Sequence, residues 1–317
     1  MENSSGDRVI GVVVMTYGSA TTVEHVAEYM AHIYHGAPPA DVVKDFEERY
    51  RLMGPSPLIE ITQQQAQLIE VELNHNAHPG DHYVVHTGML HSEPFIERAV
   101  KECRDAGAER CIGVILSPQF SSFIMDGYRA AFERAARAYG IPEEGIIIAD
   151  PWPTEPHFIR LLSDRVRASL QTLEDRYHKK IPVIFTTHSL PKRVVEKDPH
   201  YLDQLQSTIR AVLEHIGDPS LEWYAGYQSA GHTPEEWLKP DLTDILTDIK
   251  NKGAPAVLIV PIQFLADHLE ILYDLDIAAR KQCEDLDIAY HRIQLPNTDP
   301  LFIKSIADVV YNTNKHI

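Results

Sequence analysis

Short runs of apolar residues punctuate the chain and define its pattern of secondary structure. Most runs are rich in β-branched residues and do not alternate with polar ones, which is typical of strands buried on both faces of a parallel sheet. The pattern predicts strands over Val9–Met15, His82–His86, Cys111–Leu116, Ile146–Ala149, Ile181–Thr186, Trp223–Ala225, Ala256–Pro261 and Asp287–Tyr290.

Longer segments between these runs repeat apolar residues at the three-to-four-residue spacing of a helix. Alternating strands and helices predict an α/β fold with parallel sheets, doubly wound by helices on both faces. The helices are expected over Thr62–His75, Glu93–Ala106, Met125–Tyr139, His157–Tyr177, Tyr201–Ile216 and Asp241–Lys252.

Three strand ends recur in the same order along the chain. VVVMTYGS at 12–19 resembles VIFTTHSL at 183–190, HTGMLHSEPF at 86–95 resembles YAGYQSAGHTPEEW at 224–237, and VILSPQFSSF at 114–123 resembles LIVPIQFLAD at 258–267. The repeat predicts two similar Rossmann-like halves, each a parallel sheet flanked by helices, with a cleft between them. The alternative is that strands of parallel sheets resemble one another by composition alone.

Proline-rich segments indicate the limits of the two halves. PWPTEP at 151–156 predicts a boundary between an N-terminal half over 8–151 and a C-terminal half over 152–299. A last helix over 300–317 is expected to pack back on the first half. Residues 35–58 form a polar, proline-rich insertion with a short helix, which is typical of a lid over a binding site.

Composition narrows the class of protein. The chain has 317 residues and a net charge of −17, and this charge argues against binding of nucleic acid or of an anionic membrane surface. The three cysteines have no CxxC spacing, and no apolar run reaches the roughly 20 residues of a membrane span. The N-terminus lacks the order of a signal peptide, so we expect a soluble cytoplasmic protein.

The segment 257–274, VLIVPIQFLADHLEILYD, combines a buried strand with several ionisable residues. A helical pattern follows the strand and carries Asp267, His268, Glu270 and Asp274. Because Glu270 and Asp274 are four residues apart, a helix would place them on one face. Carboxylates at the end of a parallel strand are well placed for proton transfer or for binding a cation, although most glutamates are simply exposed.

Two further strand ends carry candidate ligands. His188 follows a buried strand and precedes a Ser-Leu-Pro turn, where an imidazole can bind a metal or accept a proton near neutral pH. The alternative for His188 is a hydrogen-bonded structural histidine, because the chain has 17 histidines. Tyr17 precedes Gly18 at the end of the first strand, and its alternative is a packed tyrosine. The sequence lacks four motifs of common α/β enzymes: GxGxxG after the first strand, the Walker loop, GxSxG and HExxH. With those classes disfavoured, binding of a metal or of a ring-shaped ligand in a cleft remains as a candidate function.

The chain resembles the ferrochelatase family over almost its whole length. The resemblance lies in VVMTYGS, SPL at 56–58, ITQQQA, HSEPFIE, SPQFSSF, THSLP, YQSAGHTPEEWLKPD and VPIQFLADHLEILYD. It is strongest to the short form of Gram-positive bacteria, which acts on coproporphyrin III. The resemblance implies two Rossmann-like halves around a porphyrin, and insertion of Fe²⁺ as a substrate with no cofactor required for turnover.

The resemblance also implies roles for individual residues. His188 and Glu270 match the catalytic pair that accepts pyrrole protons or binds iron, and Asp274 extends this pair as an outer relay. Tyr17 matches the residue on the opposite face of the ring, in axial contact with the product iron. The porphyrin itself would contact Tyr17, Tyr34, Arg49, Ser56, His91, Ser121, Ser122 and Ser229.

The chain departs from the family pattern in three places. Tyr34 and His35 stand where relatives often have two basic residues, which weakens an expected contact to propionates. A single Gly54 followed by Pro55 replaces a glycine pair before SPL. Ala278 replaces an acid one turn beyond Asp274, which weakens the expectation of a second metal ion at that end of the acidic row.

Coproporphyrin III is preferred as the substrate because the segment 35–57 is polar, whereas membrane-associated relatives have a hydrophobic lip there. Alternatives are a protoporphyrin IX ferrochelatase, a chelatase for cobalt or nickel in a sirohydrochlorin-like ring, and a non-enzymatic haem carrier that binds iron through Tyr17. The expected partners are a porphyrin and ferrous iron, with transient contacts to neighbouring enzymes of the haem pathway.

Overall fold

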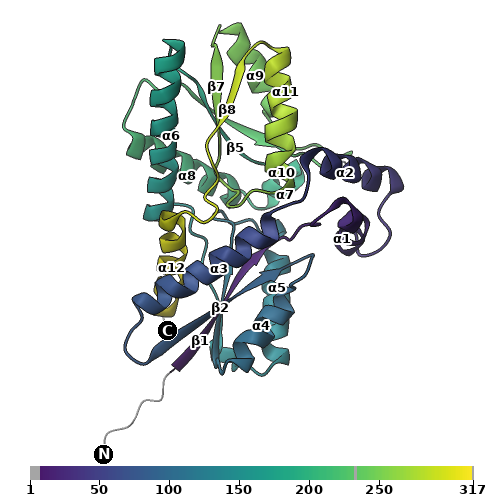
Figure 1. Cartoon of the computed structure of the whole chain (residues 1–317), viewed down its shortest axis with the longest axis vertical. Helices are drawn as coiled ribbons and strands as arrows, with labels where there is room; N and C mark the ends of the chain where they lie inside the picture. Colours follow the sequence, from purple (N-terminus) through teal and green to yellow (C-terminus); the bar gives the residue numbers. More distant parts are fainter. Residues whose placement is uncertain (1–7, 232–233, 316–317) are drawn as a thin grey trace, which may run out of the picture.

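The computed structural model describes residues 8–231 and 234–315, and it contains two four-stranded parallel sheets, one in each half of the chain (Figure 1). The first sheet has the strand order β2-β1-β3-β4 and the second has the order β6-β5-β7-β8. The strands are β1 (Arg8–Thr16), β2 (Asp81–Met89), β3 (Arg110–Ile115), β4 (Ile146–Ile148), β5 (Val183–His188), β6 (Trp223–Gln228), β7 (Ala256–Pro261) and β8 (Ala289–Arg292).

The two halves have the same topology. In each, the first strand lies between the second and the third, and the fourth lies at the edge beside the third. The three repeated sequence pairs fall on β1 with β5, β2 with β6 and β3 with β7. This confirms the prediction of two similar Rossmann-like halves, because matching pairs occupy matching positions in the two sheets.

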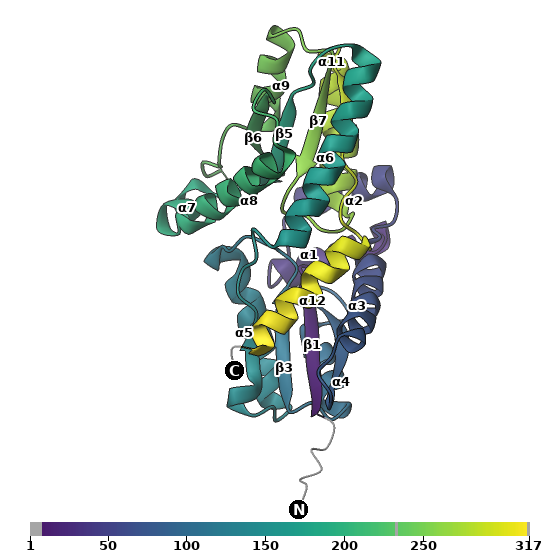
Figure 2. The ribbon, with the colours of Figure 1, turned by 90° about the vertical axis from the view of Figure 1, so that its left-hand side faces the viewer.

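The non-alternating apolar runs are strands covered on both faces. In β1, Val12, Val13 and Val14 are fully buried, and every residue of β7 is buried. Figure 2 shows helices on both sides of the strands in each half. Covering both faces removes the reason for polar residues at alternate positions, so the sequence pattern and the parallel pairing agree.

Helices surround the two sheets and connect their strands. They are α1 (Val26–Ile33), α2 (Ala40–Met53), α3 (Leu58–His75), α4 (Ile96–Asp105), α5 (Ser122–Ala138), α6 (Pro156–Tyr177), α7 (Lys192–Lys197), α8 (His200–Ile216), α9 (Leu242–Asn251), α10 (Leu269–Leu272), the π-helix (Asp274–Ala279), α11 (Arg280–Asp285) and α12 (Pro300–Lys315), with 3₁₀ turns at Val23–His25 and Glu143–Gly145.

Several boundaries differ from those expected from the sequence. The eighth strand begins at Ala289 because Asp287 has a φ of 54° and belongs to the turn after α11. The sixth strand continues to Gln228, three residues further than expected, and so brings Ser229 to the strand end. The insertion over 35–58 contains a helix of 14 residues, α2, which ends at Gly54 with a φ of 85°.

The last helix joins the two halves. Helix α12 lies beside both α3 and α6 (Figure 2). Tyr311 donates a hydrogen bond to the carbonyl of Leu73, and Asn314 accepts one from Arg110. Phe302 is fully buried in a cluster that also contains β1 and β5 residues. One continuous core therefore includes strands of both sheets.

Of the helices described, none has the length and apolar character to cross a membrane.

Candidate active site

Segments that follow strands of both sheets come together near α10. Tyr17 follows β1 of the first sheet, whereas His188 ends β5 and Ser229 follows β6 of the second. Burial raises the pKa of Tyr17 to about 12, and the neighbouring charge of Glu270 on α10 adds to this rise. Chemistry at the carboxyl ends of parallel strands is typical of α/β enzymes, and here the ends of two sheets contribute to one site.

His188 and Glu270 face each other. Nε2 of His188 lies 3.6 Å from Oε1 of Glu270, and their side chains are 27% and 33% exposed. On its other side, Nδ1 of His188 contacts the carbonyl oxygen of Ser189, which can only accept a hydrogen bond. This contact places a proton on Nδ1 and leaves Nε2 as the ring nitrogen that faces Glu270.

Glu270 also faces a second histidine, His268. Its Oε2 lies 3.8 Å from Nε2 of His268, whose Nδ1 contacts the carbonyl of Ala266 at 2.9 Å. Burial lowers the pKa of His268, but the hydrogen bond and charge of Glu270 outweigh burial, and the net pKa is raised. Burial likewise opposes ionisation of Glu270, yet His188 and His268 bring the pKa of its carboxyl below the ordinary value. Glu270 is therefore a carboxylate at neutral pH.

The acidic segment is not the single helix that the sequence predicts. Residues 262–268 form a loop, α10 is four residues long, and a π-helix follows it. The N–H of Ala278 donates to the carbonyl of Tyr273, five residues back, at 2.8 Å, which is the π-helical pattern. Asp276 on this π-helix forms a two-point ion pair with Arg292 of β8, with a shortest contact of 2.6 Å. This pair fixes the π-helix to the second sheet.

Asp274 remains close to Glu270 despite the change of helix type. The hydroxyl of Ser229 donates to Oδ2 of Asp274, and Nη1 of Arg49 lies 3.4 Å from Oδ1. Burial and the charge of Glu270 raise the pKa of Asp274, and Ser229 and Arg49 only partly offset this rise. The contact with Arg49 is notable because Arg49 belongs to α2 of the insertion in the first half.

Aromatic rings surround the Arg49 side chain. Its guanidinium lies 5.2 Å from the ring centre of Phe46 on α2 and 5.2 Å from that of Tyr273, which follows α10. Leu269 of α10 packs in the same apolar cluster as Tyr50 of α2. The insertion is therefore attached to the segment that carries Glu270 through both charge and apolar contacts.

Tyr17 belongs to a group of rings on the first half. Its ring centre lies 4.5 Å from that of His91, and the Nδ1 atoms of His91 and His32 are 3.0 Å apart. Burial, with His32 and His35, lowers the pKa of His91 to about 4, so His91 is neutral at physiological pH. Tyr34 is 46% exposed. These rings offer stacking surface rather than fixed positive charge.

The four serines predicted to line the site differ in their surroundings. Ser56 and Ser121 are buried, and within the described structure their hydroxyls have no hydrogen-bond partner. Ser122 is satisfied, because both its N–H and its hydroxyl donate to Asp198 at 3.0 Å. Ser229 binds Asp274. Ser56 and Ser121 therefore differ from Ser122 and Ser229 in having buried hydroxyls without a hydrogen-bond partner in the described structure.

Glutamines that the sequence interpretation did not single out hold the site together. Gln263 accepts a hydrogen bond from the backbone N–H of His188 at 3.0 Å, and Gln228 donates to the carbonyl of Glu270 at 2.9 Å. Gln119 donates to the carbonyl of Ile262 at 3.1 Å. Gln119 and Gln263 occupy the Gln-Phe position of the repeated motif, so the repeat itself contained a signal for them.

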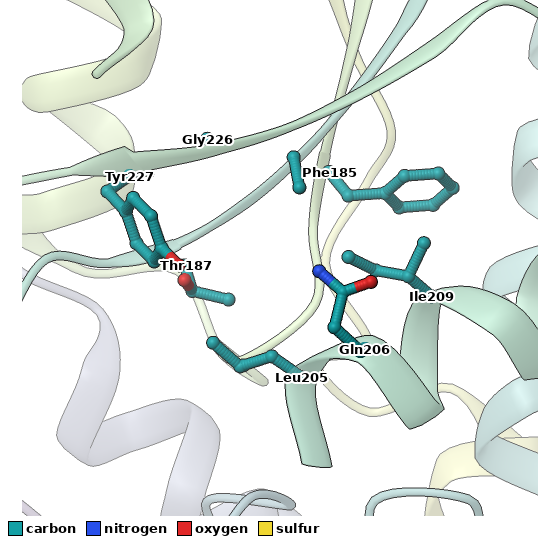
Figure 3. A pocket seen from close by; sticks show the side chains of 8 residues that line it. Phe185, Thr187, Leu205, Gln206, Ile209, Gly226 and Tyr227 are labelled. Atoms are coloured by element: carbon teal, nitrogen blue, oxygen red, sulfur yellow. The ribbon is translucent and has the colours of Figure 1, made fainter. Parts of the chain in front are cut away.

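A small cavity lies in the second half, outside this group of residues. It has a volume of about 10 Å³ and lies between β5, β6 and α8, where Phe185, Thr187 and Tyr227 point toward Leu205 and Ile209 (Figure 3). A cavity of this size holds about one water molecule. It is a packing gap and not a site for a tetrapyrrole.

Solved structures of chelatases share this fold. Sirohydrochlorin chelatase SirB from Bacillus subtilis subspecies spizizenii, solved in complex with cobalt, has a TM-score of 0.56 and 13% identity over 98% of this chain and 96% of its own. CbiX, described as the terminal enzyme for biosynthesis of siroheme in denitrifying bacteria, has a TM-score of 0.54 and 11% identity over 96% and 99% of the two chains. The fold is therefore that of two-halved chelatases.

Sequence comparison gives the family. The ferrochelatase family model matches residues 9–314, so the chain belongs to the ferrochelatase family. It is 35% identical to the coproporphyrin III ferrochelatase of Geobacillus kaustophilus, over 96% of this chain and 95% of that protein. It is also 35% identical to the coproporphyrin III ferrochelatase of Bacillus subtilis, over 95% of this chain and 96% of that protein. A ferrochelatase of Deinococcus radiodurans is likewise 35% identical, over 98% of each chain. The resemblance noted from sequence motifs is confirmed.

Proposed function

We propose that this protein inserts Fe²⁺ into coproporphyrin III, the substrate that the names of several relatives give. The observation that carries the proposal is the 3.6 Å approach of His188 Nε2 to Glu270 Oε1, on a segment that also faces Tyr17. Both groups are proton acceptors, and imidazole with carboxylate suits ferrous iron. Iron and porphyrin are substrates in this proposal, and no resident cofactor is invoked.

The reaction releases two protons for each iron that enters. Each pyrrole N–H gives its proton to an acceptor, and the two nitrogen lone pairs then bind Fe²⁺ without a change in its oxidation state. Ionised Glu270 and the Nε2 lone pair of His188 are the acceptors. Glu270 raises the pKa of His268, and His268 in turn favours the ionised form of the Glu270 carboxyl. Tyr17 lies toward the opposite face of the ring as the axial contact to the product iron.

The substrate preference rests on the surroundings of the ring edge. Ser56 and Ser121 present free buried hydroxyls, and Tyr34 with His91 supplies stacking surface and a neutral imidazole. Arg49 is already bound to Asp45 and Asp274, so we assign it the role of holding the lid rather than a free propionate contact. A polar lid is consistent with a porphyrin that carries carboxylates around its edge.

The proposed function also suggests where the protein acts and which proteins it contacts. Cys103, Cys111 and Cys283 are unpaired and buried, which suits a reducing compartment and supports the cytoplasm as the site of the reaction. The product, an iron porphyrin with limited solubility, would pass to another enzyme of the pathway through a transient contact.

Substrate selection tests the proposal. The purified enzyme is given Fe²⁺ anaerobically with coproporphyrin III, protoporphyrin IX or sirohydrochlorin, and kcat/KM is measured by absorbance for each. We expect coproporphyrin III to exceed protoporphyrin IX by roughly tenfold or more, a difference of about 1.4 kcal/mol in transition-state binding. An enzyme that metallates sirohydrochlorin or protoporphyrin IX and leaves coproporphyrin III unchanged would overturn the proposal.

A further inference from the structure

A second group of metal-ligating side chains lies where α6 begins and α12 passes it. The group consists of Glu155, His157 and Asp308. Glu155 and His157 flank Pro156 at the start of α6, whereas Asp308 lies in the middle of α12. None of the three contacts the His188–Glu270 pair through a hydrogen bond or ion pair that the described residues form. The group is therefore separate from the proposed reaction site.

The spacing of these three side chains matches a metal site. One ligand atom of each lies within 4.8 Å of the others, and Nε2 of His157 is 3.3 Å from Oδ2 of Asp308. A tetrahedral ion with bonds of about 2.0–2.2 Å separates its ligands by roughly 3.3–3.6 Å. The His157–Asp308 edge already has this length, and a carboxylate oxygen of Glu155 lies within 4.8 Å of both ligand atoms.

Charge at this group is not balanced by a basic side chain. Glu155 is only 9% exposed, and its side chain accepts a hydrogen bond from the N–H of Phe158, at 2.8 Å to Oε2. Asp308 pairs with His157, and in the described part of the chain no lysine or arginine lies within 4.0 Å of either carboxylate. The Asp308 side chain is 39% exposed, so Glu155 is the buried carboxylate of the group, and buried carboxylates are ordinarily paired or bound to a metal. Most other carboxylates of this chain that form ion pairs do so with lysine or arginine.

We propose that Glu155, His157 and Asp308 form a binding site for one divalent transition-metal ion, with zinc as the expected occupant. One imidazole and two carboxylates are a donor set that Zn²⁺ accepts, and a water molecule can supply the fourth ligand. The ion would join the start of α6 to α12 and so fasten the C-terminal helix to the second half. It would take no part in iron insertion.

This site is tested by metal binding in a protein whose other metal site has been disabled. In a His188→Gln background, which removes the imidazole of the proposed reaction site, Zn²⁺ is titrated by calorimetry and Co²⁺ by its visible absorption. We expect one ion per chain. We also expect saturating Zn²⁺ to raise Tm by roughly 4 °C at a hundredfold excess over Kd.

Adding His157→Gln should remove the bound ion and the Tm rise, as should Asp308→Asn. The matched control is His200→Gln, because His200 also faces an aspartate, at 3.9 Å, but its side chain is 80% exposed and the described residues supply no third ligand there. Circular dichroism confirms folding of each variant, and iron insertion in the His157→Gln single variant should be unchanged. The proposal is overturned if the parent binds no zinc, or if zinc stoichiometry and Tm shift persist in folded His157→Gln and Asp308→Asn proteins.

Discussion

The ionisable side chains at the site divide into groups with distinct charge. Glu270 is a carboxylate because two histidines face it, at 3.6 and 3.8 Å, and outweigh the effect of burial. His268 has a raised pKa, whereas His91, on the side of Tyr17, is neutral because its pKa is about 4. Ionisable groups therefore gather around Glu270, and a neutral aromatic surface surrounds Tyr17.

Asp274 gives a pH-dependent prediction. Its folded-state pKa is raised, chiefly by burial, so above the ordinary value of 3.8 the unfolded chain loses this proton more readily than the folded chain. The wild-type protein should therefore lose stability relative to Asp274→Asn as the pH rises from about 4 to 7. Urea unfolding of both proteins across this range measures the difference.

The exposed Asp203→Asn is the control and should show no such trend, since the Asp203 side chain is 80% exposed. A stability difference between wild type and Asp274→Asn that is constant with pH, or that grows in favour of the wild type, would contradict the assignment of a raised pKa to Asp274.

Single residues at the site were predicted from motif and position, and their contacts were not. The sequence singled out His188, Glu270 and Tyr17 because each follows a buried strand. It could not show that Arg49 reaches Asp274, because that contact joins residues 225 positions apart on different halves. The same holds for Gln263 and His188, which meet only once β5 and β7 pair.

At the scale of elements, the lid and the acidic segment form one unit. Helix α2 contacts α10 through the apolar cluster of Tyr50 and Leu269 and through the Arg49–Asp274 ion pair. Helix α10 leads directly into the π-helix, which the Asp276–Arg292 pair anchors to β8. The insertion over 35–58 is therefore joined directly to the segment that positions Glu270.

Replacing Arg49 tests this coupling. Arg49→Met keeps the length of the side chain but removes the ion pair with Asp274, whose side chain is 14% exposed. We expect amide hydrogen exchange in α2 to become about tenfold faster, while exchange in β1 is unchanged. Mass spectrometry of peptic fragments resolves the two segments.

Arg51→Met is the matched control on the same helix. Arg51 pairs with Glu47 and Glu48 at a half-exposed position, where ion pairs contribute little to stability. The Arg51→Met substitution should therefore leave hydrogen exchange in α2 unchanged. Equal exchange in the Arg49 variant and the wild type would show that this pair does not hold the lid.

Strands were easier to predict than the segments between them. Buried parallel strands have a strong apolar signal, and each predicted strand is present with small shifts at its ends. The loop over 262–268 and the π-helix were missed because the apolar spacing of LEILYDLDIAA also suits an α-helix. Tertiary contacts, above all Asp276 with Arg292, select the wider turn.

The whole molecule has a core shared by its two sheets. Ile10 and Val12 of β1, Val183 and Phe185 of β5, and Phe302 of α12 belong to one buried cluster. Helix α12 begins after the last strand of the second half and returns to α3 of the first. The two halves should therefore unfold together in one cooperative transition, although they look like separate repeats in sequence.

Phe302→Ala tests the shared core. Phe302 is fully buried near Trp152, with ring centres 6.4 Å apart, and its truncation should lower the free energy of unfolding by about 3–5 kcal/mol. Hydrogen exchange should increase in both β1 and β5. The exposed Lys304→Ala on the same helix is the control. Faster exchange confined to one sheet would contradict a common core.

The duplicated architecture was predictable because the repeat placed three strands of each half in the same order. The sequence also predicted a last helix on the first half, and α12 does contact α3. The sequence could not predict that α12 also contacts α6, or that this contact places Asp308 beside Glu155 and His157. Such contacts depend on how two amphipathic helices cross, which periodicity alone does not determine.

The most direct test of the account is the effect of His188→Gln on two separate quantities. Iron insertion into coproporphyrin III is measured anaerobically by absorbance, and porphyrin affinity is measured by fluorescence titration, with the exposed His200→Gln as control. Loss of the Nε2 acceptor should slow insertion at least about a hundredfold while Kd for the porphyrin changes less than about threefold. Insertion at the wild-type rate by His188→Gln would contradict the assigned site and favour a haem-binding role for Tyr17.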